Sequence, residues 1–479
     1  MQAVICTNKP FAASGSETHL EKRISFRGGA VICALPLVVF IAITIVLLVN
    51  DMIAVEGMII AAMLGISLGM LPARSMAQYS ERVFSLMANR IVTVAIICWL
   101  WAGAFSGILA ESGLVEAIVW LGWKLDLNGA AFVLAVFICS SLFAVSVGSA
   151  FVTVVSFTTV MYPAGILLGA ASGPLMGAIL SGAAFGDNVS PVSDTTIISA
   201  ATQETDVGGV VRSRLKYALT AGAIAGVLFY LFGAGENSVN PTEAEKLVAE
   251  YANPKALPML IPGIIVFITA IRGYHFFTAI NLGIASAVLI GSLTGIFPLE
   301  QVFHLTADGT VAGSAVSGVL AMLPVSILVL LLITIYGILQ DGGFFELFLG
   351  WIDRYTTRSK RGVESVIVAL ISLANLCVPG NTTAMITAGP LANEIRKNHG
   401  IHPYRSANLL DTISCSFPFL LPYATIVIAA GTIQAEVASI YPFVPVLSWE
   451  GTAPFVFYGI VLFPLMILSV ITGVGSRKG

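Results

Sequence analysis

The chain has 479 residues, of which 57% are hydrophobic and only 10% are charged, with a mean hydropathy of +0.93 and a net charge of −3. Soluble domains carry about 25% charged residues, so a chain this apolar could not cover a soluble surface and is predicted to be a membrane protein. The slightly acidic balance excludes a basic nucleic-acid-binding surface. The six cysteines are scattered, without the spacing of a metal site, and are interpreted as small buried hydrophobic residues.

Apolar stretches of about 20 residues, the length needed to cross a bilayer, follow one another along the chain. A polar tail, 1–28, precedes them and lacks the pattern of a cleavable signal peptide. The longest polar join, within 234–255, is too short to be a domain, so we expect a single membrane domain. The candidate stretches are 29–49, 52–70, 91–109, 129–147, 150–169, 174–200, 217–233, 256–271, 276–297, 315–339, 363–378, 382–395, 406–430 and 454–471.

One polar segment lies where a span is expected: residues 186–196 read GDNVSPVSDTT. An ionisable side chain at bilayer depth is costly and usually faces a cavity or an ion path, while Pro, Asn and Ser disfavour an unbroken helix. A broken helix frees backbone carbonyls, which together with carboxylate and hydroxyl oxygens suit a hard cation such as Na⁺. The predicted ion-binding residues are Asp187 and Asp194, as the main Na⁺ ligands, with Asn188, Ser190, Thr195, Thr196, Ser146 and Ser149.

The basic residues predict the topology, because Lys and Arg concentrate in the cytoplasmic loops of membrane proteins. Most of the 23 basic residues fall on one side if 129–169 and 363–395 each form a hairpin that enters and leaves on the same side. Small polar residues interrupt both stretches, which suits a re-entrant hairpin with its tip inside the protein. Both termini are then expected in the cytoplasm, and the join 234–255 is an extracytoplasmic linker.

The two halves of the chain show the same order of elements. Residues 29–233 read as three spans, a hairpin, a broken span and a span, and residues 256–475 read the same way from the opposite side. The predicted fold class is therefore an all-α polytopic membrane protein with an inverted-topology repeat, each half having a re-entrant hairpin and a broken transmembrane helix. Such repeats place their site near the midplane. The second half contributes a predicted substrate or second-ion site of Asn381, Thr382, Thr383, Asp411 and Ser414. A structural role for Asp411 stays equally open.

The segment 186–196 resembles the GDxxSPxSDTT motif of the NhaC-type sodium/proton antiporter family, and residues 90–475 fit the organisation of that family. The family is part of an ion-transporter superfamily that includes sodium-coupled dicarboxylate symporters, whose hairpin tips resemble residues 380–383. The resemblance implies a secondary transporter of the cell inner (plasma) membrane. It also implies hairpin-bearing elements that move against a dimeric scaffold, and hence a homodimer.

Two functions stay open. The first is Na⁺/H⁺ antiport, because burial favours the protonated form of a carboxylate and bound Na⁺ favours the ionised form, so that the two ions compete. The alternative is a sodium-coupled symporter or exchanger of an amino acid or small organic acid. The absence of a basic residue from the predicted midplane argues against a multiply charged anion.

No enzyme is expected, since the sequence has no P-loop, no HExxH motif and no readable nucleophile–base pair. The expected partners are the lipid bilayer, Na⁺ and H⁺ and, in the alternative, a small zwitterion or organic acid. Neither a cofactor nor nucleic acid is expected.

Overall fold

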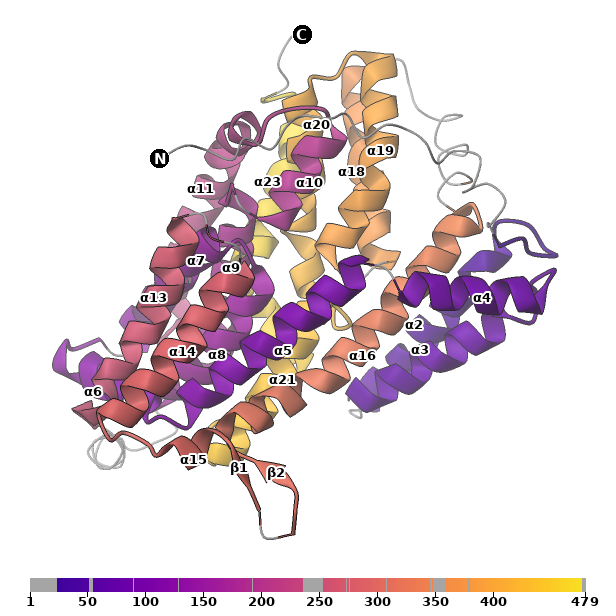
Figure 1. The fold of residues 1–479 in the computed structure, drawn as a ribbon. Helices are drawn as coiled ribbons and strands as arrows, with labels where there is room; N and C mark the ends of the chain where they lie inside the picture. Colours follow the sequence, from indigo (N-terminus) through magenta and orange to yellow (C-terminus); the bar gives the residue numbers. More distant parts are fainter. Residues whose placement is uncertain are drawn as a thin grey trace, which may run out of the picture.

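The computed structural model describes residues 24–475 except 51–54, 89, 128, 192, 236–252, 273, 275, 307, 345–346, 348–358 and 378–379. The described chain is mostly helical (Figure 1). Two short strands, β1 (His304–Leu305) and β2 (Val311–Ala312), pair antiparallel at the end of the molecule that also holds α6 and α15.

The first half contains the predicted helices and two further ones, α4 and α6. The helix α4 is too short and polar to count as a span, and α6 is bent by 63° from the preceding helical segment. The elements are η1 (Ile32–Ala34), α2 (Leu35–Val49), α3 (Val55–Gly69), α4 (Met76–Met87), α5 (Arg90–Ala110), α6 (Leu114–Lys124), α7 (Gly129–Val147), α8 (Ala150–Leu167), α9 (Ser172–Val189), α10 (Asp194–Thr202) and α11 (Val207–Phe232).

The second half again follows the predicted order. Its predicted broken span, 406–430, is interrupted after Ser414 by the short 3₁₀ turn η3. The elements are η2 (Pro254–Met259), α13 (Leu260–Ile271), α14 (Phe276–Leu293), α15 (Leu299–Val302), α16 (Ser314–Asp341), α18 (Lys360–Cys377), α19 (Asn381–His399), α20 (Pro403–Ser414), η3 (Phe417–Leu420), α21 (Thr425–Ile440), α22 (Trp449–Thr452), η4 (Ala453–Phe455) and α23 (Phe457–Thr472).

In the described chain, 4 helical segments are long and apolar enough to cross a membrane, or up to 6 if each bent pair is one span. Shorter apolar helices, among them α2, α3 and α14, accompany them. The chain is thus a multi-pass membrane protein, as its composition predicts. The inverted relation between the halves and the re-entrant course of the pairs α7–α8 and α18–α19 stay predictions.

The break between α7 and α8 lies where the sequence places it. Gly148 has a φ of +68°, a left-handed conformation that favours glycine. The next residue, Ser149, caps α8, because its hydroxyl oxygen accepts a hydrogen bond from the backbone N–H of Val152 at 3.4 Å.

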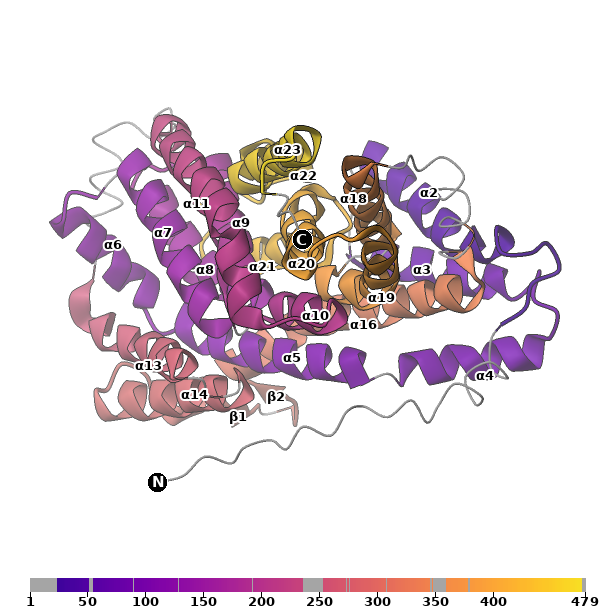
Figure 2. The ribbon, with the colours of Figure 1, turned by 90° about the horizontal axis from the view of Figure 1, so that it is seen from above.

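Close helix packing joins the two halves. Helices α5 and α16 run side by side (Figures 1 and 2), and a Cβ atom at Gly103 would lie 2.2 Å from the carbonyl oxygen of Gly318. Helix α9 is buried along nearly its whole length, and a Cβ at Gly186 would lie 2.2 Å from the Cβ of Ala144 on α7. Small residues thus let the helices that carry the polar segment lie against their neighbours.

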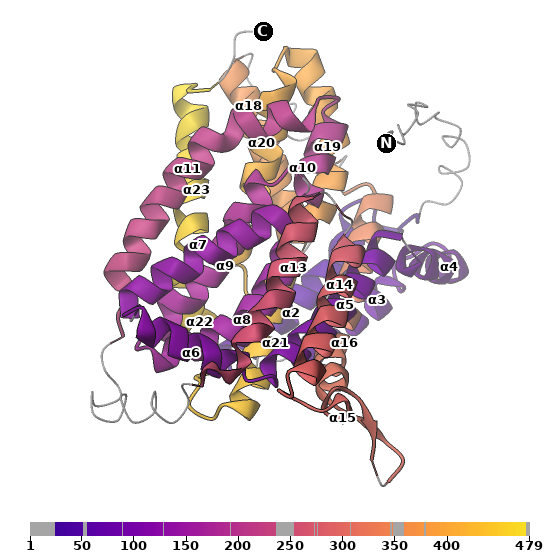
Figure 3. The ribbon, with the colours of Figure 1, turned by 60° about the vertical axis from the view of Figure 1, so that its left-hand side comes forward.

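The C-terminal ends of both halves meet around α20. Seen from above, α20 lies between α11 on one side and the pair α18–α19 on the other (Figure 2). Helices α11 and α23 run beside each other (Figure 3). This arrangement brings α9 and α10 of the first half close to α20 and the helix pair α18–α19 of the second half.

Candidate functional site

The polar segment interrupts its helix. Helix α9 ends at Val189 and α10 begins at Asp194, because Pro191 has no backbone N–H to continue the ladder. The hydroxyl oxygen of Ser193 accepts a hydrogen bond from the N–H of Thr195 at 3.3 Å and caps α10. Asp187 lies in the last turn of α9 and is only 4% exposed.

Three neutral donors surround the carboxylate of Asp187. The Ser193 hydroxyl donates to Oδ1 at 2.6 Å, and the Asn381 amide donates to Oδ2 at 2.9 Å. The Cys415 thiol lies 3.7 Å from the same Oδ2. The hydroxyl of Thr195 extends the group, 2.9 Å from that of Ser193. We call these five residues the Asp187 cluster.

Both halves of the chain build the Asp187 cluster. The end of α9 supplies the carboxylate, and the break and the start of α10 supply the two hydroxyls. The first residue of α19 supplies the amide, and the residue after α20 supplies the thiol. The structure therefore joins Asn381 to the first predicted site, although the sequence analysis assigned it to a separate one.

The Asp187 carboxylate has no directly paired cation. Among the described residues, no basic side chain lies within ion-pair distance of it, and its hydrogen-bond partners are neutral. A buried carboxylate without a cation is costly in a low-dielectric environment. Binding of a proton or a Na⁺ ion would remove that cost.

The second buried carboxylate, Asp411 on α20, is already compensated. Arg214 on α11 forms a hydrogen-bonded ion pair with Oδ2 of Asp411, and both side chains are fully buried. The other terminal nitrogen of Arg214 donates to the Thr196 hydroxyl at 2.7 Å. The thiol of Cys415 donates to Oδ1 of Asp411 at 3.3 Å and so links this pair to the Asp187 cluster.

Arg214 corrects the expectation that the site lacks a nearby basic residue. The predicted span 217–233 starts after Arg214, but α11 begins at Val207 and buries this side chain. One signal was available: Arg214 is one helical turn after Val210 and one before Ala218, two further buried residues of α11, so a helical period puts all three on one face.

The other predicted residues of the polar segment have different surroundings. Asp194 is exposed on the first turn of α10. The Ser190 hydroxyl donates to the carbonyl oxygen of Val145 at 2.6 Å and ties the break to α7. Asn188 is fully buried, and neither polar atom of its side chain has a hydrogen-bond partner among the described residues.

The residues predicted on the hairpins and on α20 complete the set. The backbone N–H of Thr382 donates to the Asn381 side-chain oxygen at 2.9 Å. The Ser414 hydroxyl accepts a hydrogen bond from the Asn375 amide at 2.9 Å, away from Asp187. The side chains of Ser146 and Thr383 lie outside the described part of the structure.

The predicted ion-binding residues did not include Ser193 or Cys415, which are both partners of Asp187. Cys415 was interpreted as a small hydrophobic residue, yet its thiol contacts two carboxylates. Its spacing gave a clue, since Cys415 lies one helical turn after Asp411 and therefore on the same face.

Comparisons with known proteins agree with a transport function. Residues 23–234 match the sequence profile of the Na⁺/H⁺ antiporter family. The chain is 30% identical over 213 residues to the malate-2H⁺/Na⁺-lactate antiporter of Bacillus subtilis, an alignment that spans 44% of each protein. It is 24% identical over 477 residues to the arginine/ornithine antiporter ArcD of Halobacterium salinarum, covering 95% of this chain and 93% of that relative.

Two further similarities are weaker in identity. The chain is 22% identical over 276 residues to the Na⁺/H⁺ antiporter NhaC of Alkalihalophilus pseudofirmus, covering 55% of this chain and 57% of that relative. Among solved structures, MtrF of Neisseria gonorrhoeae aligns with a TM-score of 0.41 and 12% identity, over 82% of this chain and 83% of that one. The profile match and the antiporter relatives confirm that the chain resembles the NhaC-type sodium/proton antiporter family.

Proposed function

We propose that this chain is a secondary active transporter of the plasma membrane that exchanges Na⁺ for H⁺ at Asp187. The observation that carries the proposal is the burial of the Asp187 carboxylate without a directly paired cation, at the break of a membrane helix. Asp411, in contrast, already has Arg214. The match of residues 23–234 to the Na⁺/H⁺ antiporter family supports the same reading.

The cluster can serve either ion. The hydroxyls of Ser193 and Thr195 each have an oxygen that can face a cation once the hydrogen rotates away, and Asn381 can offer its amide oxygen after a flip. With a proton bound instead, Asp187 becomes a donor and the same neutral partners still satisfy it. One site is therefore used in turn by two ions, which is the requirement for antiport. The proposed activity involves no covalent chemistry.

The proposal includes the architecture that alternating access needs. The two halves form an inverted repeat with both termini in the cytoplasm, and residues 129–169 and 363–395 form the re-entrant hairpins. A homodimer supplies the scaffold against which the hairpin-bearing elements move.

The apparent Na⁺ affinity should depend on pH. A protonated Asp187 cannot hold Na⁺, so acidification should weaken the affinity, by about tenfold per pH unit where the site is mostly protonated, and a plateau should appear at high pH. The affinity can be measured as the Na⁺ concentration for half-maximal thermal stabilisation of purified protein, because a ligand of the folded state raises its stability. An affinity that is constant between pH 5 and 9 would rule out competition at this site.

A second candidate function is sodium-coupled symport or exchange of an amino acid or small organic acid. Two observations favour it. Asn381, at the predicted hairpin tip, donates directly to the Asp187 carboxylate, so a substrate held at that tip would sense the ion. The relatives include proteins named as a malate-2H⁺/Na⁺-lactate antiporter and an arginine/ornithine antiporter.

Replacement of Asn381 by Ala should distinguish the two functions. In the exchanger, the amide helps to hold the cation, so Asn381→Ala should weaken Na⁺ binding in the absence of any organic solute. In the carrier, Na⁺ binding should persist while uptake of radiolabelled lactate, malate or arginine disappears. Thermal stability with Na⁺ alone, then with Na⁺ and each solute, reads out both, and Asn393→Ala at the far end of the same helix is the matched control. Stabilisation of the wild type by one of these solutes only in the presence of Na⁺, followed by its transport, would favour the carrier.

A further inference from the structure

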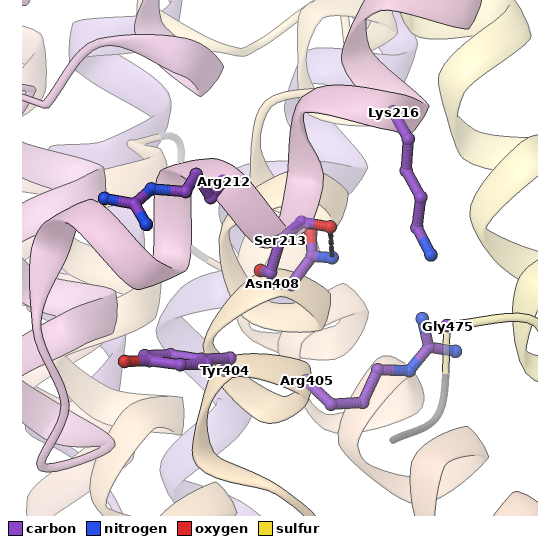
Figure 4. A pocket seen from close by; sticks show the side chains of 7 residues that line it. All are labelled: Arg212, Ser213, Lys216, Tyr404, Arg405, Asn408 and Gly475. Carbon is purple, nitrogen blue, oxygen red and sulfur yellow. Dashed lines mark hydrogen bonds between the residues drawn. The ribbon is translucent and has the colours of Figure 1, made fainter.

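A pocket of about 160 Å³ lies between α11 and α20, away from the Asp187 cluster. Its wall contains three basic side chains, those of Arg212, Lys216 and Arg405 (Figure 4). The ammonium of Lys216 and the guanidinium of Arg405 lie on the same side, next to Gly475. No carboxylate is among the described residues that line the pocket.

Arg405 is held in this wall by buried hydrogen bonds. It is only 3% exposed, and one terminal nitrogen donates to Glu364 at 2.8 Å while the other donates to Ser469 at 2.8 Å. Its Nε–H has no hydrogen-bond partner among the described residues. An unsatisfied donor on a buried, charged side chain is costly, so a ligand with acceptor oxygens would be favoured here.

The charges around the pocket leave a positive excess. Glu364 forms an ion pair with Arg405, and the carboxylate of Asp206, which accepts a hydrogen bond from the Tyr404 hydroxyl, interacts electrostatically with Arg212. The two remaining cations, Arg212 and Lys216, are both exposed. Among these described residues, two carboxylates therefore face three cations, and the net positive charge that remains is available to an anion.

The pocket lies at the ends of its helices and not at mid-span. Residues 212–216 immediately precede the apolar run of α11 that starts at Tyr217, and Gly475 follows the end of α23 at Thr472. In a membrane protein this is the depth of the lipid headgroups, where basic residues meet phosphate. The Asn408 amide donates one N–H to the carbonyl oxygen of Ser213 and has a second N–H for the wall, whereas the Ser213 hydroxyl already donates to the carbonyl oxygen of Val210.

We propose that this pocket binds a phosphate group, which holds α11, α20 and the end of α23 together. The group is either the phosphodiester of an anionic lipid headgroup or free inorganic phosphate, since several cations and an amide donor around one small space suit a tetrahedral oxyanion. The site is independent of the Na⁺ site proposed at Asp187.

The test compares a double variant, Arg212→Gln with Lys216→Gln, with a control double variant, Lys124→Gln with Lys397→Gln. All four side chains are exposed, so neither variant loses buried packing, and both lose the same charge. The apparent melting temperature is measured against inorganic phosphate, with chloride as the counter-series at the same Na⁺ concentration and ionic strength. It is measured again in nanodiscs of phosphatidylcholine with and without phosphatidylglycerol.

The wild type and the control should be stabilised saturably, and the half-saturating concentration should rise about tenfold or more in the pocket variant. Stabilisation by inorganic phosphate alone assigns the site to a soluble ligand, and stabilisation only by phosphatidylglycerol assigns it to a lipid headgroup. Equal effects of phosphate and chloride together with no effect of phosphatidylglycerol would overturn the proposal. Equal stabilisation of the pocket variant and the control would overturn it as well.

Discussion

Replacement of Asp187 by Asn should abolish Na⁺-dependent transport and leave the chain folded. The substitution keeps the size of the side chain and removes the only charge of the Asp187 cluster. An amide at this position can still bond to Ser193 and Asn381, so no buried group loses its partner. Without the anion, neither Na⁺ nor H⁺ has a reason to bind. Proteoliposomes with an internal pH dye and an imposed Na⁺ gradient measure the loss, and thermal unfolding measures the fold.

The matched control is Asp194→Asn, which makes the same chemical change seven residues later. Asp194 is exposed on α10, whereas Asp187 is buried. Water screens the charge of Asp194, so its loss should have a smaller effect on the Na⁺ affinity. Full transport by Asp187→Asn would sink the proposed site. Loss of transport in Asp194→Asn alone would move the ion to α10.

The sequence was sufficient to find the break in α9 because the signal there is local. A proline, several hydroxyls and two carboxylates inside an apolar run conflict with a continuous lipid-facing helix, whatever packs around it. The same kind of local signal located the break between α7 and α8 at Gly148, and the start of α19 after Gly380. These local signals identified the elements that could carry a site.

The contacts between distant elements could not be predicted, because the register of one helix against another is absent from a single sequence. The link from Asn381 to Asp187 spans 194 residues, and the link from Cys415 to Asp187 spans 228. The spacing of Cys415 places it on the same face as Asp411, but nothing in the sequence indicates its contact with Asp187. Arg214 was missed for a different reason: its basic neighbours Arg212 and Lys216 are typical of a loop, so the predicted span starts at residue 217, ten residues after the true start of α11 at Val207.

The largest effect on stability is expected from Arg214→Gln. Among the described residues, this change leaves the fully buried carboxylate of Asp411 with the hydroxyl of Ser199 and the thiol of Cys415, both at 3.3 Å. Removal of one partner of a buried ion pair typically costs about 3–5 kcal/mol of folding free energy, since the other charge stays buried without compensation. The apparent melting temperature in detergent should therefore fall steeply.

The double variant Arg214→Gln with Asp411→Asn should recover most of that loss, because it removes both charges and leaves two amides that can bond to each other. The single variant Asp411→Asn is informative in a different way. It leaves the buried cation of Arg214 without its partner, and a single residue, Cys415, separates Arg214 from Asp187. Arg214 would then compensate the charge of Asp187, so Na⁺ binding should weaken. The double variant should restore Na⁺ binding. If Arg214→Gln melts at the wild-type temperature, the pair is not buried as described. If Asp411→Asn binds Na⁺ normally, the two carboxylates do not sense each other, and the division of labour between a compensated Asp411 and an exchangeable Asp187 is wrong.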